Sequence, residues 1–594
     1  MKTRLALVVI LALLLAAMVR VERTRASVPV SPAPLLDLIA DGEQEVGRLP
    51  ARGLRVSDGE EIRIGNDMAA HLRFGANPAN RTDDERLGMY LARVGGALAA
   101  HATRPLPYHF HYVSDPDMVN AFALPGGHVY VGAGILQWID SEDELAALLG
   151  HEIEHIDHYH CADRAVTEAR GRRFPLGEVA ALPVALFQAG YSKQEELEAD
   201  REGMRLAVAA GYSASGAVHL LETLDRRFHQ EATPDASPGA ELSRVAAASL
   251  SGYFRSHPPT AERLAQLRQL MATEHWNSFA ERPLRESDVL ATGRAESAWA
   301  AGHLSEAHRW AQRALELNAS QWHARRLLAE VEFAQAQFAA AAADARRALQ
   351  ASPGDVALLE RYADALAADH HPAAALAQFE DFLASRPAAT TLDAAVLIEK
   401  AGLQRLDGDP TAFNGLASDR TGVHSAALSP ELRGRWGWWQ YRAGDWTWAA
   451  SLLREAVAMR PQNARLQGEL GWVLIAQHNY EEALARFAAA RRDGDTLPFN
   501  LDRPPRNSPD EAAEDGQAAV GRCVALRLTS VPGAAPPDAG CDAALDQTPQ
   551  WSNSEWVAAQ YPPEVVRIAS TLTRELRLRR LADQRLQDRR EPPR

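Results

Sequence analysis

Residues 151–155 read His-Glu-Ile-Glu-His, and this short stretch decides how the rest of the chain is interpreted. On an α-helix, residues four apart lie on one face, so His151 and His155 can bind one zinc ion together. Glu152 lies between them and is positioned to accept a proton from the attacking water as a general base. Because five residues are only a moderately specific pattern, a helix that is merely rich in histidine is the alternative. The pattern predicts a catalytic site for a metallopeptidase with one Zn²⁺ per chain.

The sequence on both sides of this motif predicts helices. Residues 140–144 combine capping residues with the acids of a first helical turn, and an apolar run leads from them into the motif. A later helix, predicted over 195–210, carries Glu196 and Asp200 four residues apart. A catalytic zinc commonly has three protein ligands, so one carboxylate can bind the metal while the other orients a ligand. A solvated acidic face is the alternative.

Two short strands are predicted ahead of the motif. Residues 106–113 alternate like a strand, and His128-Val129-Tyr130-Val131 follows a turn at Gly126-Gly127 as a second strand. Helices combined with a small set of strands predict an α+β domain, which we place over residues 35–275.

Between residues 290 and 495 the chain becomes rich in alanine and repeats itself. Matching residues recur at intervals of 34: Ala307, Ala341 and Ala375; Ala314, Ala348 and Phe382; Pro353 and Pro387; Ala449 and Ala483. This period is the signature of tetratricopeptide repeats (TPR), because small residues let two antiparallel helices approach closely and proline ends the second. The alternative is a generic alanine-rich helical region. We therefore predict an all-α TPR solenoid, with a divergent helical pair or a loop between 390 and 440.

The N-terminal residues 1–26 are typical of an export signal. A short basic stretch precedes an apolar run of 15 residues, which is shorter than the roughly 20 needed to span a membrane. Thr24-Arg25-Ala26 is a fair cleavage site, but the arginines that follow the apolar run resist translocation. The segment is therefore either a cleaved signal or an uncleaved anchor that holds the protein at the membrane. Both place the protein in the periplasm, and retention in the cytoplasm is the alternative.

Charge and cysteine content exclude two classes of protein. A formal net charge of −15 argues against nucleic acid as a partner, since a phosphate-binding surface needs clustered Lys and Arg. Three cysteines are too few for a disulfide scaffold. Cys523 and Cys541 either pair in an oxidising compartment or remain thiols, and Cys161 is expected to be a packing residue on the motif helix.

The C-terminal part, residues 496–594, is predicted to be a linker and a basic helical tail. Residues 500–517 and 531–540 are rich in Pro, Asp and Gly, which is typical of linkers, whereas 523–528 fits a strand or a helix. Residues 563–590 predict an arginine-rich helix, which is either solvated or in contact with an anionic surface.

Several motifs together resemble the zincin peptidases of the HtpX and CAAX-prenyl-protease type, and most of all their exported BepA-like branch, which joins a peptidase domain to TPR repeats. These motifs are the strand region 120–131, the motif 151–155 with His160, the Glu-x-x-Ala-Asp helix at 196–203, and Ser256-His257-Pro258-Pro259 with Arg263. The resemblance covers residues 35–275 and, by repeat type, 290–495. Two departures stand out: Glu154 replaces a small residue, and the segment past 500 has no counterpart.

The resemblance implies roles for individual residues. Glu196 would be the third zinc ligand, and Asp200 would orient a ligand. His257 would stabilise the oxyanion or approach the zinc and hold the enzyme inactive; its alternative is a turn before a helix. An extended substrate would add as a strand beside an exposed edge formed by His128, Val129 and Tyr130, unless this is an ordinary buried strand.

The function implied is an exported zinc endopeptidase that degrades misfolded or stalled envelope proteins. Its partners would be unfolded or misassembled substrates and, through the TPR repeats, the outer-membrane protein assembly machinery. The alternative is a TPR adaptor or chaperone for outer-membrane protein assembly whose peptidase domain is largely autoinhibited.

Overall fold

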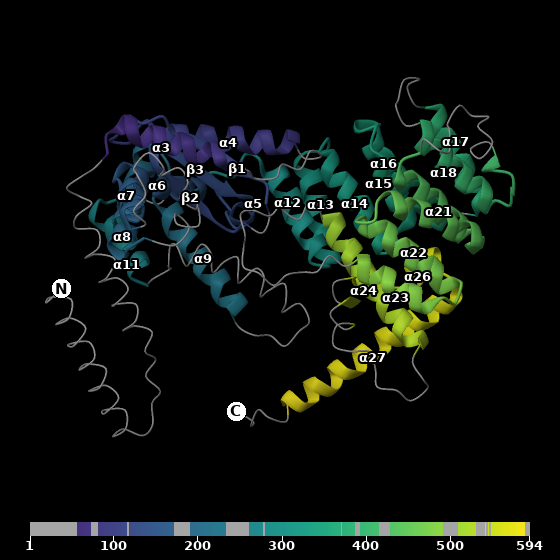
Figure 1. Cartoon of the computed structure of the whole chain (residues 1–594). Helices are drawn as coiled ribbons and strands as arrows, with labels where there is room; N and C mark the ends of the chain where they lie inside the picture. Colours follow the sequence, from purple (N-terminus) through teal and green to yellow (C-terminus); the bar gives the residue numbers. More distant parts are fainter. Residues whose placement is uncertain are drawn as a thin grey trace.

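The chain forms an α+β part followed by an all-helical part, which the computed structural model shows side by side (Figure 1). The structure describes residues 56–72, 81–115, 118–171, 191–232, 261–276, 280–369, 371–385, 393–414, 428–490, 509–529, 541, 544–545 and 548–588. The predicted export signal and His257 lie outside these residues. Within the described ranges, no helix is both long enough and apolar enough to cross a membrane.

The first part contains a sheet of three strands: β1 (His109–Val113), β2 (Ala121–Leu124) and β3 (His128–Gly132). Their order is β1-β3-β2, with β1 parallel and β2 antiparallel to β3. The link from β2 to β3 is a single 3-10 turn, η2 (Pro125–Gly127). Gly126 has a φ of 79°, and a Cβ there would lie 2.7 Å from the Cα of Ile62, so glycine is required at this turn.

The prediction that β3 is an exposed edge is wrong. β3 is the central strand, with residues of β1 and of β2 paired along its two sides. Its main-chain groups are therefore committed to the sheet, and a substrate strand cannot add there. The chain order of the strands gave no sign of this, because β1 joins the sheet on the far side of β3.

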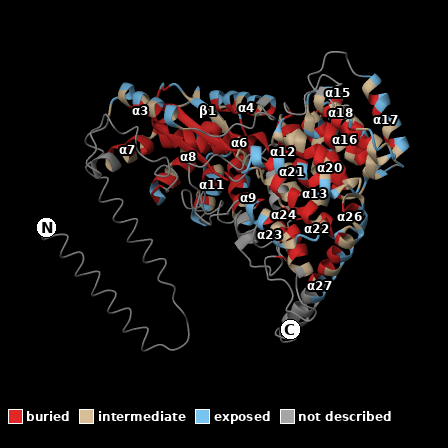
Figure 2. Cartoon of the chain, turned by 45° about the vertical axis from the view of Figure 1, so that its right-hand side comes forward, coloured by how far each residue is buried: buried red, intermediate tan, exposed pale blue. Residues whose placement is uncertain are grey.

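Helices surround this sheet. They are α3 (Asp58–His71), α4 (Arg81–Ala99), α5 (Ala133–Leu136), α6 (Glu142–Asp157), α7 (His160–Gly171), α8 (Lys193–Ala209), α9 (Ser215–Ala232) and α11 (Ala261–Thr273). The central helix is α6, which packs against α4, α8, α9 and β2. All of its residues are buried (Figure 2).

The limits of α6 follow from its sequence. The Ser141 hydroxyl accepts a hydrogen bond from the Glu144 amide at the N-terminus, where three acidic residues complement the helix dipole. The helix ends at Asp157, and Tyr159 in the following turn has a φ of 65°. Cys161 is buried as expected, but it lies in α7 rather than on the motif helix, because this turn separates the two helices.

The helical part begins with α12 and continues as helix after helix. These are α12 (Ser287–Ala300), α13 (Leu304–Leu317), α14 (Trp322–Ala334), α15 (Phe338–Ala351), α16 (Val356–Asp369), α17 (Pro372–Ala384), α18 (Asp393–Leu406), α20 (Pro430–Arg442), α21 (Trp446–Met459), α22 (Ala464–Ala476) and α23 (Tyr480–Ala490). Ala307, Ala341 and Ala375 take the same place in α13, α15 and α17 and are completely buried. Small residues at this place allow each helix to lie close to its neighbours.

The C-terminal part folds onto the repeats. It comprises α24 (Pro509–Thr529), η6 (Pro549–Ser552), α26 (Ser554–Gln560) and α27 (Pro563–Asp588), and α24 packs against α12, α22 and α23. The predicted linker over 500–517 is therefore wrong from Pro509 onward, since this stretch belongs to α24. Cys523 and Cys541 form a disulfide.

Aromatic side chains anchor this C-terminal part to α20 and α22. The ring of Trp551 stacks on that of Trp472 with centroids 5.1 Å apart, and Tyr561 lies 4.8 Å from Trp472. The Arg442 guanidinium donates a hydrogen bond to the Ala559 carbonyl. Both tryptophans are almost completely buried, so η6 and α26 are part of the core of the repeats.

Polar contacts join the two parts of the molecule. The Arg86 guanidinium on α4 donates to both carboxylate oxygens of Asp288 on α12, at 2.9 and 3.1 Å, and to Glu286. On α14, His323 places its Nδ1 2.7 Å from a carboxylate oxygen of Asp83. Helices α4, α12 and α14 thus form a tight junction.

Candidate metal centre

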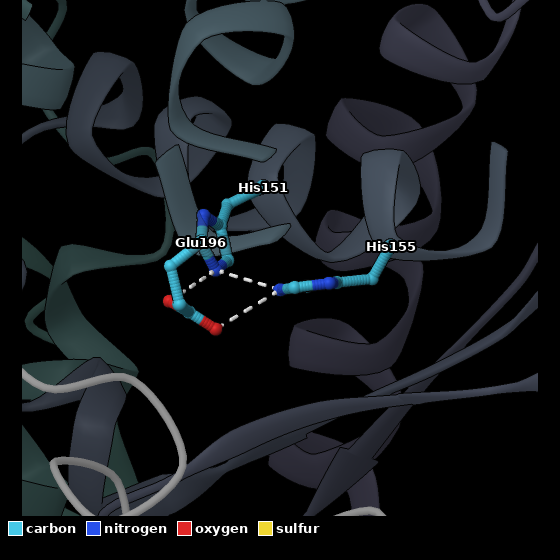
Figure 3. Close-up of side chains that lie close together, drawn as sticks. All are labelled: His151, His155 and Glu196. Carbon is cyan, nitrogen blue, oxygen red and sulfur yellow. Dashed lines mark hydrogen bonds and ion pairs between the residues drawn. The ribbon is translucent and has the colours of Figure 1, made fainter. Parts of the chain in front are cut away.

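Three side chains from two helices converge at the middle of the first part. His151 and His155 come from α6 and Glu196 from α8, and their ligand-type atoms all lie within 4.8 Å of one another (Figure 3). The two Nε2 atoms are 3.1 Å apart. The carboxylate oxygens of Glu196 lie 3.6 Å from Nε2 of His151 and 3.5 Å from Nε2 of His155.

This donor set fits zinc. Two imidazole nitrogens and one carboxylate are a common protein set for a catalytic zinc, which keeps a fourth position open. Bonds of about 2.0–2.1 Å in a tetrahedron place the ligand atoms about 3.3 Å apart, close to the three separations here. Since two neutral imidazoles cannot both donate toward each other, a cation between them satisfies both lone pairs.

The geometry depends on how α8 begins and how closely it approaches α6. Ser192 and Glu195 form a capping box at the N-terminus of α8, which places Glu196 in the first turn. Further along, Gly203 faces His151, and a Cβ at Gly203 would lie 2.8 Å from the His151 amide nitrogen. The glycine therefore allows the backbones of the two helices to approach closely.

Asp200 and Arg263 support His151. The Nδ1 atom of His151 lies 3.0 Å from a carboxylate oxygen of Asp200. Arg263 on α11 is buried and donates to both carboxylate oxygens of Asp200, at 2.5 and 2.6 Å, while its Nη1 lies 3.1 Å from Glu196. One guanidinium thus balances two buried carboxylates.

The charges around His151 set its protonation and that of Asp200. Burial alone lowers the pKa of His151, but the hydrogen bond that His151 donates to Asp200 and the charge of Glu196 outweigh it and raise the pKa. Burial raises the pKa of Asp200, and the Arg263 charge reverses this, so its pKa is lowered. Asp200 is therefore an anion beside His151.

His155 has a different environment. Burial holds the pKa of His155 well below its usual value, and the neighbouring His151 adds to the effect. The ring of Tyr191 stacks on His155 with centroids 3.8 Å apart, and the two Nδ1 atoms of His155 and His160 are 3.0 Å apart. A neutral imidazole in a fixed orientation is the form that binds a metal.

The two acids of the motif point to different places. Glu152 is completely buried next to the metal-binding positions. Glu154 instead turns toward His158, with 3.1 Å between its carboxylate and Nε2. Burial raises the pKa of Glu154, and the bond to His158 opposes this. The unusual acid of the motif is therefore paired with a histidine at the end of α6 rather than with the metal ligands.

The residues predicted to bind substrate, His128, Val129 and Tyr130, lie apart from this cluster, on the central strand. His128 Nε2 lies 2.9 Å from the Asn66 side-chain oxygen, and its Nδ1 lies 3.0 Å from His111. Burial and the adjacent histidines lower the pKa of His128 to about 4, so the ring is neutral at physiological pH. Because β3 is the central strand, the predicted exposed edge at these residues is wrong.

A second group among the described residues also brings ligand-type atoms together. Glu144, His219 and Glu281 lie at the N-terminus of α6. The carboxylate of Glu281 already accepts hydrogen bonds from Ser141 and Ser215 and lies 2.6 Å from Nδ1 of His219. These contacts account for the cluster without a metal. Glu281, in the segment before α12, is bound to the N-terminus of α6 through Ser141.

Sequence reasoning did not assign roles to Arg263 and Tyr191. Arg263 stood in a motif of the resemblance without a function, and its partner Asp200 is 63 residues away in sequence. Tyr191 precedes α8 and carries no signal of its own. Both contacts depend on how α6, α8 and α11 pack.

Comparison with known proteins agrees with this geometry. Residues 85–271 match the model of peptidase family M48, and residues 292–356 and 440–496 match models of the tetratricopeptide repeat. This chain is therefore a metallopeptidase: an M48 peptidase domain is followed by a helical region of tetratricopeptide repeats. The predicted fold class, an α+β zincin-type peptidase domain followed by an all-α TPR solenoid, is confirmed.

Its relatives are proteases. The beta-barrel assembly-enhancing protease of Yersinia pestis is 26% identical over 442 residues, which cover 64% of this chain and 90% of that protein. The protein of the same name from Escherichia coli (strain K12) is 31% identical over 215 residues, 32% of this chain and 42% of that protein. Metalloprotease YcaL of the same strain is 28% identical over 241 residues, 37% of this chain and 82% of that protein.

Proposed function

We propose that this protein is an exported zinc endopeptidase that hydrolyses peptide bonds of misfolded or stalled envelope proteins in the periplasm. The observation that carries the proposal is the grouping of His151, His155 and Glu196 around one point, with Glu152 beside it. The names of the relatives from Yersinia pestis and Escherichia coli support a role in the assembly of outer-membrane proteins.

Each residue has a proposed part in the reaction. His151, His155 and Glu196 would hold the metal, and a bound zinc would polarise the substrate carbonyl and lower the pKa of a water. Glu152 would accept the proton of the attacking water and pass it to the leaving amine. Asp200 and Arg263 would keep His151 and Glu196 in position. His257 remains a candidate for oxyanion stabilisation or autoinhibition.

The substrate would lie along β2 rather than β3. Of the described strands, β2 is the edge strand that packs on α6, the helix of His151 and His155. All four residues of β2 are buried, so a peptide could pair with it only after covering segments move. Main-chain pairing with an extended peptide depends little on substrate side chains, which suits the removal of many different misfolded proteins.

The repeats would dock substrates or the outer-membrane protein assembly machinery. The C-terminal part already covers helices α14, α16, α20 and α22, to which η6 and α26 are bound through Asn553, Tyr561 and Trp551. Docking would therefore use surfaces of the repeats that this part leaves uncovered.

An autoinhibited adaptor or chaperone is the second candidate. The burial of the centre favours it, because His151, Glu152, His155 and Glu196 are each 4% exposed or less. A peptide must reach these side chains to be cleaved, so their burial supports a closed form of the enzyme. Glu154 adds a charge to the motif, but it points to His158 rather than to the metal ligands, so it does not support this candidate.

The experiment is cleavage of casein and of an unfolded outer-membrane protein by the chain without residues 1–26. The Glu152→Gln variant is measured beside it, together with the zinc content of both. About one zinc per chain in both, with cleavage only by the unsubstituted protein, would support the peptidase. Zinc without cleavage in either would favour the adaptor, and absence of zinc from both would reject the proposed metal centre.

A further inference from the structure

Three carboxylates of helix α8, those of Glu196, Glu198 and Asp200, lie at alternate positions. They contact the two histidines of α6 in different ways. Glu196 reaches both Nε2 atoms directly, and Asp200 reaches Nδ1 of His151. Glu198, between them, lies 3.4 Å from Nε2 of His160, whose Nδ1 lies 3.0 Å from Nδ1 of His155. Each predicted metal ligand of α6 thus has a polar partner on the far side of its ring.

The hydrogen-bond pattern allows one consistent assignment of protons. If Nε2 of His155 binds the metal, its Nδ1 carries the hydrogen and donates it to Nδ1 of His160. His160 must then be protonated on Nε2, which faces the carboxylate of Glu198. Glu198, His160 and His155 therefore form a chain in which each group fixes the tautomer and orientation of the next.

The turn between α6 and α7 holds His160 in this place. Tyr159 has a φ of 65°, which interrupts the helical backbone between the end of α6 at Asp157 and the start of α7 at His160. The Arg104 guanidinium lies over the Tyr159 ring at 3.6 Å from its centroid, and the Tyr159 carbonyl accepts a hydrogen bond from the Asp163 amide. His160 itself is 6% exposed, so its ring has little freedom to move.

We propose that His160, held by Glu198, is a positioning residue that orients His155 for metal binding, as Asp200 orients His151. The inference rests on the proposed zinc centre. It adds that α8 supports both histidines of α6, one directly and one through the first residue of α7. Loss of such a partner of a metal-binding histidine typically weakens metal affinity about 10–100-fold.

The test is the zinc affinity of the full chain, measured by competition with a chromophoric chelator. His160→Ala removes the acceptor for His155, and His160→Asn keeps a polar acceptor near the position of Nδ1. His158→Ala is the matched control, because His158 also contacts Glu198 and its nearer partner is Glu154 rather than a predicted metal ligand. Co²⁺ absorption spectra of the same variants report the geometry of the centre.

The expected result is a loss of zinc affinity of about 10–100-fold for His160→Ala, partial recovery for His160→Asn and no change for His158→Ala. Glu198→Gln should give a smaller loss. Thermal unfolding without metal checks that the variants fold. Equal affinity in His160→Ala and the unsubstituted chain would overturn the inference while leaving the proposed zinc centre intact. Absence of zinc from the unsubstituted chain would reject both.

Discussion

Arg263 brings a positive charge into the interior beside the carboxylates of Glu196 and Asp200. Its side chain is 2% exposed, and all of its contacts described above go to these two acids. Burying a carboxylate without a partner costs several kcal/mol. The guanidinium of Arg263 offsets this cost for Glu196 and Asp200. Its planar fork also fixes the orientation of Asp200.

Replacing Arg263 should therefore affect stability and metal binding together. We expect Arg263→Met to lower the free energy of unfolding by about 3–5 kcal/mol, because it leaves two buried carboxylates uncompensated. Arg263→Lys keeps the charge but loses the bidentate contact, so an intermediate loss is expected. Chemical denaturation measures both, with Arg268→Ala, an exposed arginine of the same helix, as the control. A stable, zinc-replete Arg263→Met variant would contradict this account.

For individual residues, the sequence predicts those positions that depend on spacing within one helix. His151, His155 and Glu196 are brought together, since the first two are one helical turn apart and Glu196 stands in a helix with an obvious start. The orientation of Glu154 was not predictable, because it depends on His158 lying in the turn after α6. The positions of Arg263 and Tyr191 needed the packing of separate helices.

At the contact between helices α6 and α8 there is no room for an added side chain. Gly203 and Gly150 face each other there, and a Cβ on either would meet main-chain atoms within 3 Å. Main-chain atoms of two packed helices cannot move aside as a flexible side chain can. An added methyl group must therefore push α8, and Glu196 with it, away from the histidines.

We accordingly expect Gly203→Ala to lower the free energy of unfolding by about 1–3 kcal/mol, through overpacking. Zinc affinity should fall as well, because the ligands of α6 and α8 separate. Gly96→Ala is the control: Gly96 lies in α4, where a Cβ meets nothing within 4 Å, and the change should be neutral or stabilising by up to about 1 kcal/mol. Thermal unfolding and chelator competition distinguish the two variants.

A buried acid in α14 makes the repeats sensitive to pH. Burial and the neighbouring Asp344 raise the pKa of Glu332 from 4.5 to about 8, against the opposing charges of Arg347 and Arg325. The folded chain therefore holds this proton more tightly than the unfolded chain. Its contribution to stability is complete below pH 4.5 and is lost as pH rises toward 8.

Glu332→Gln should remove this dependence, since the amide has nearly the same shape and does not ionise. We expect equal melting temperatures for variant and unsubstituted protein near pH 5, and a variant more stable by about 1–3 kcal/mol at pH 8.5. Circular dichroism melts at both pH values measure the difference. A difference that is constant with pH would show that Glu332 does not titrate as described.

The sequence predicts that these helices and strands exist, but it does not predict which of them lie side by side. The predicted helix over 195–210 is α8 (Lys193–Ala209), and the strand at His128 exists as β3. Periodicity identifies a strand without saying which strands flank it, and this is why β3 was taken for an edge. The order β1-β3-β2 follows from a parallel pairing that crosses over β2 in sequence.

For the whole molecule, the junction between peptidase domain and repeats is the main organising contact. It combines polar groups of α4, α12 and α14 with apolar packing, because Val289 and Leu290 of α12 belong to the hydrophobic core of the peptidase domain. Arg86 is its centre, since it joins α4 to Asp288 and Glu286 at the start of the repeats. Such charge-assisted contacts are specific in geometry and weaken when one partner is lost.

Arg86→Ala should loosen the two parts without unfolding either. Loss of the contacts to Asp288 and Glu286 is expected to cost about 1.5 kcal/mol, or roughly a tenfold faster amide exchange over residues 280–290. Hydrogen exchange with mass spectrometry measures this. Arg309→Ala, which removes an exposed pair with Glu306, should leave exchange there unchanged. Unaltered protection in Arg86→Ala would show that the junction is held by other contacts.

Composition was least informative for the C-terminal part. Proline, aspartate and glycine suggested a linker up to residue 517, yet α24 begins at Pro509 and packs on α22 and α23. The spacing of Cys523 and Cys541 left pairing undecided, and the structure joins them with Cα atoms 5.7 Å apart.

The stacking of Trp551 and Tyr561 on Trp472 has a consequence for the order in which the protein matures. A chain made from its N-terminus completes α22 long before η6 and α26 exist, so Trp472 is left without these aromatic neighbours in the interval. The repeats consequently reach their final form only after the last segment emerges. Until then the nascent chain exposes apolar aromatic surface at Trp472. A chaperone that binds such surface would therefore protect the chain during its synthesis.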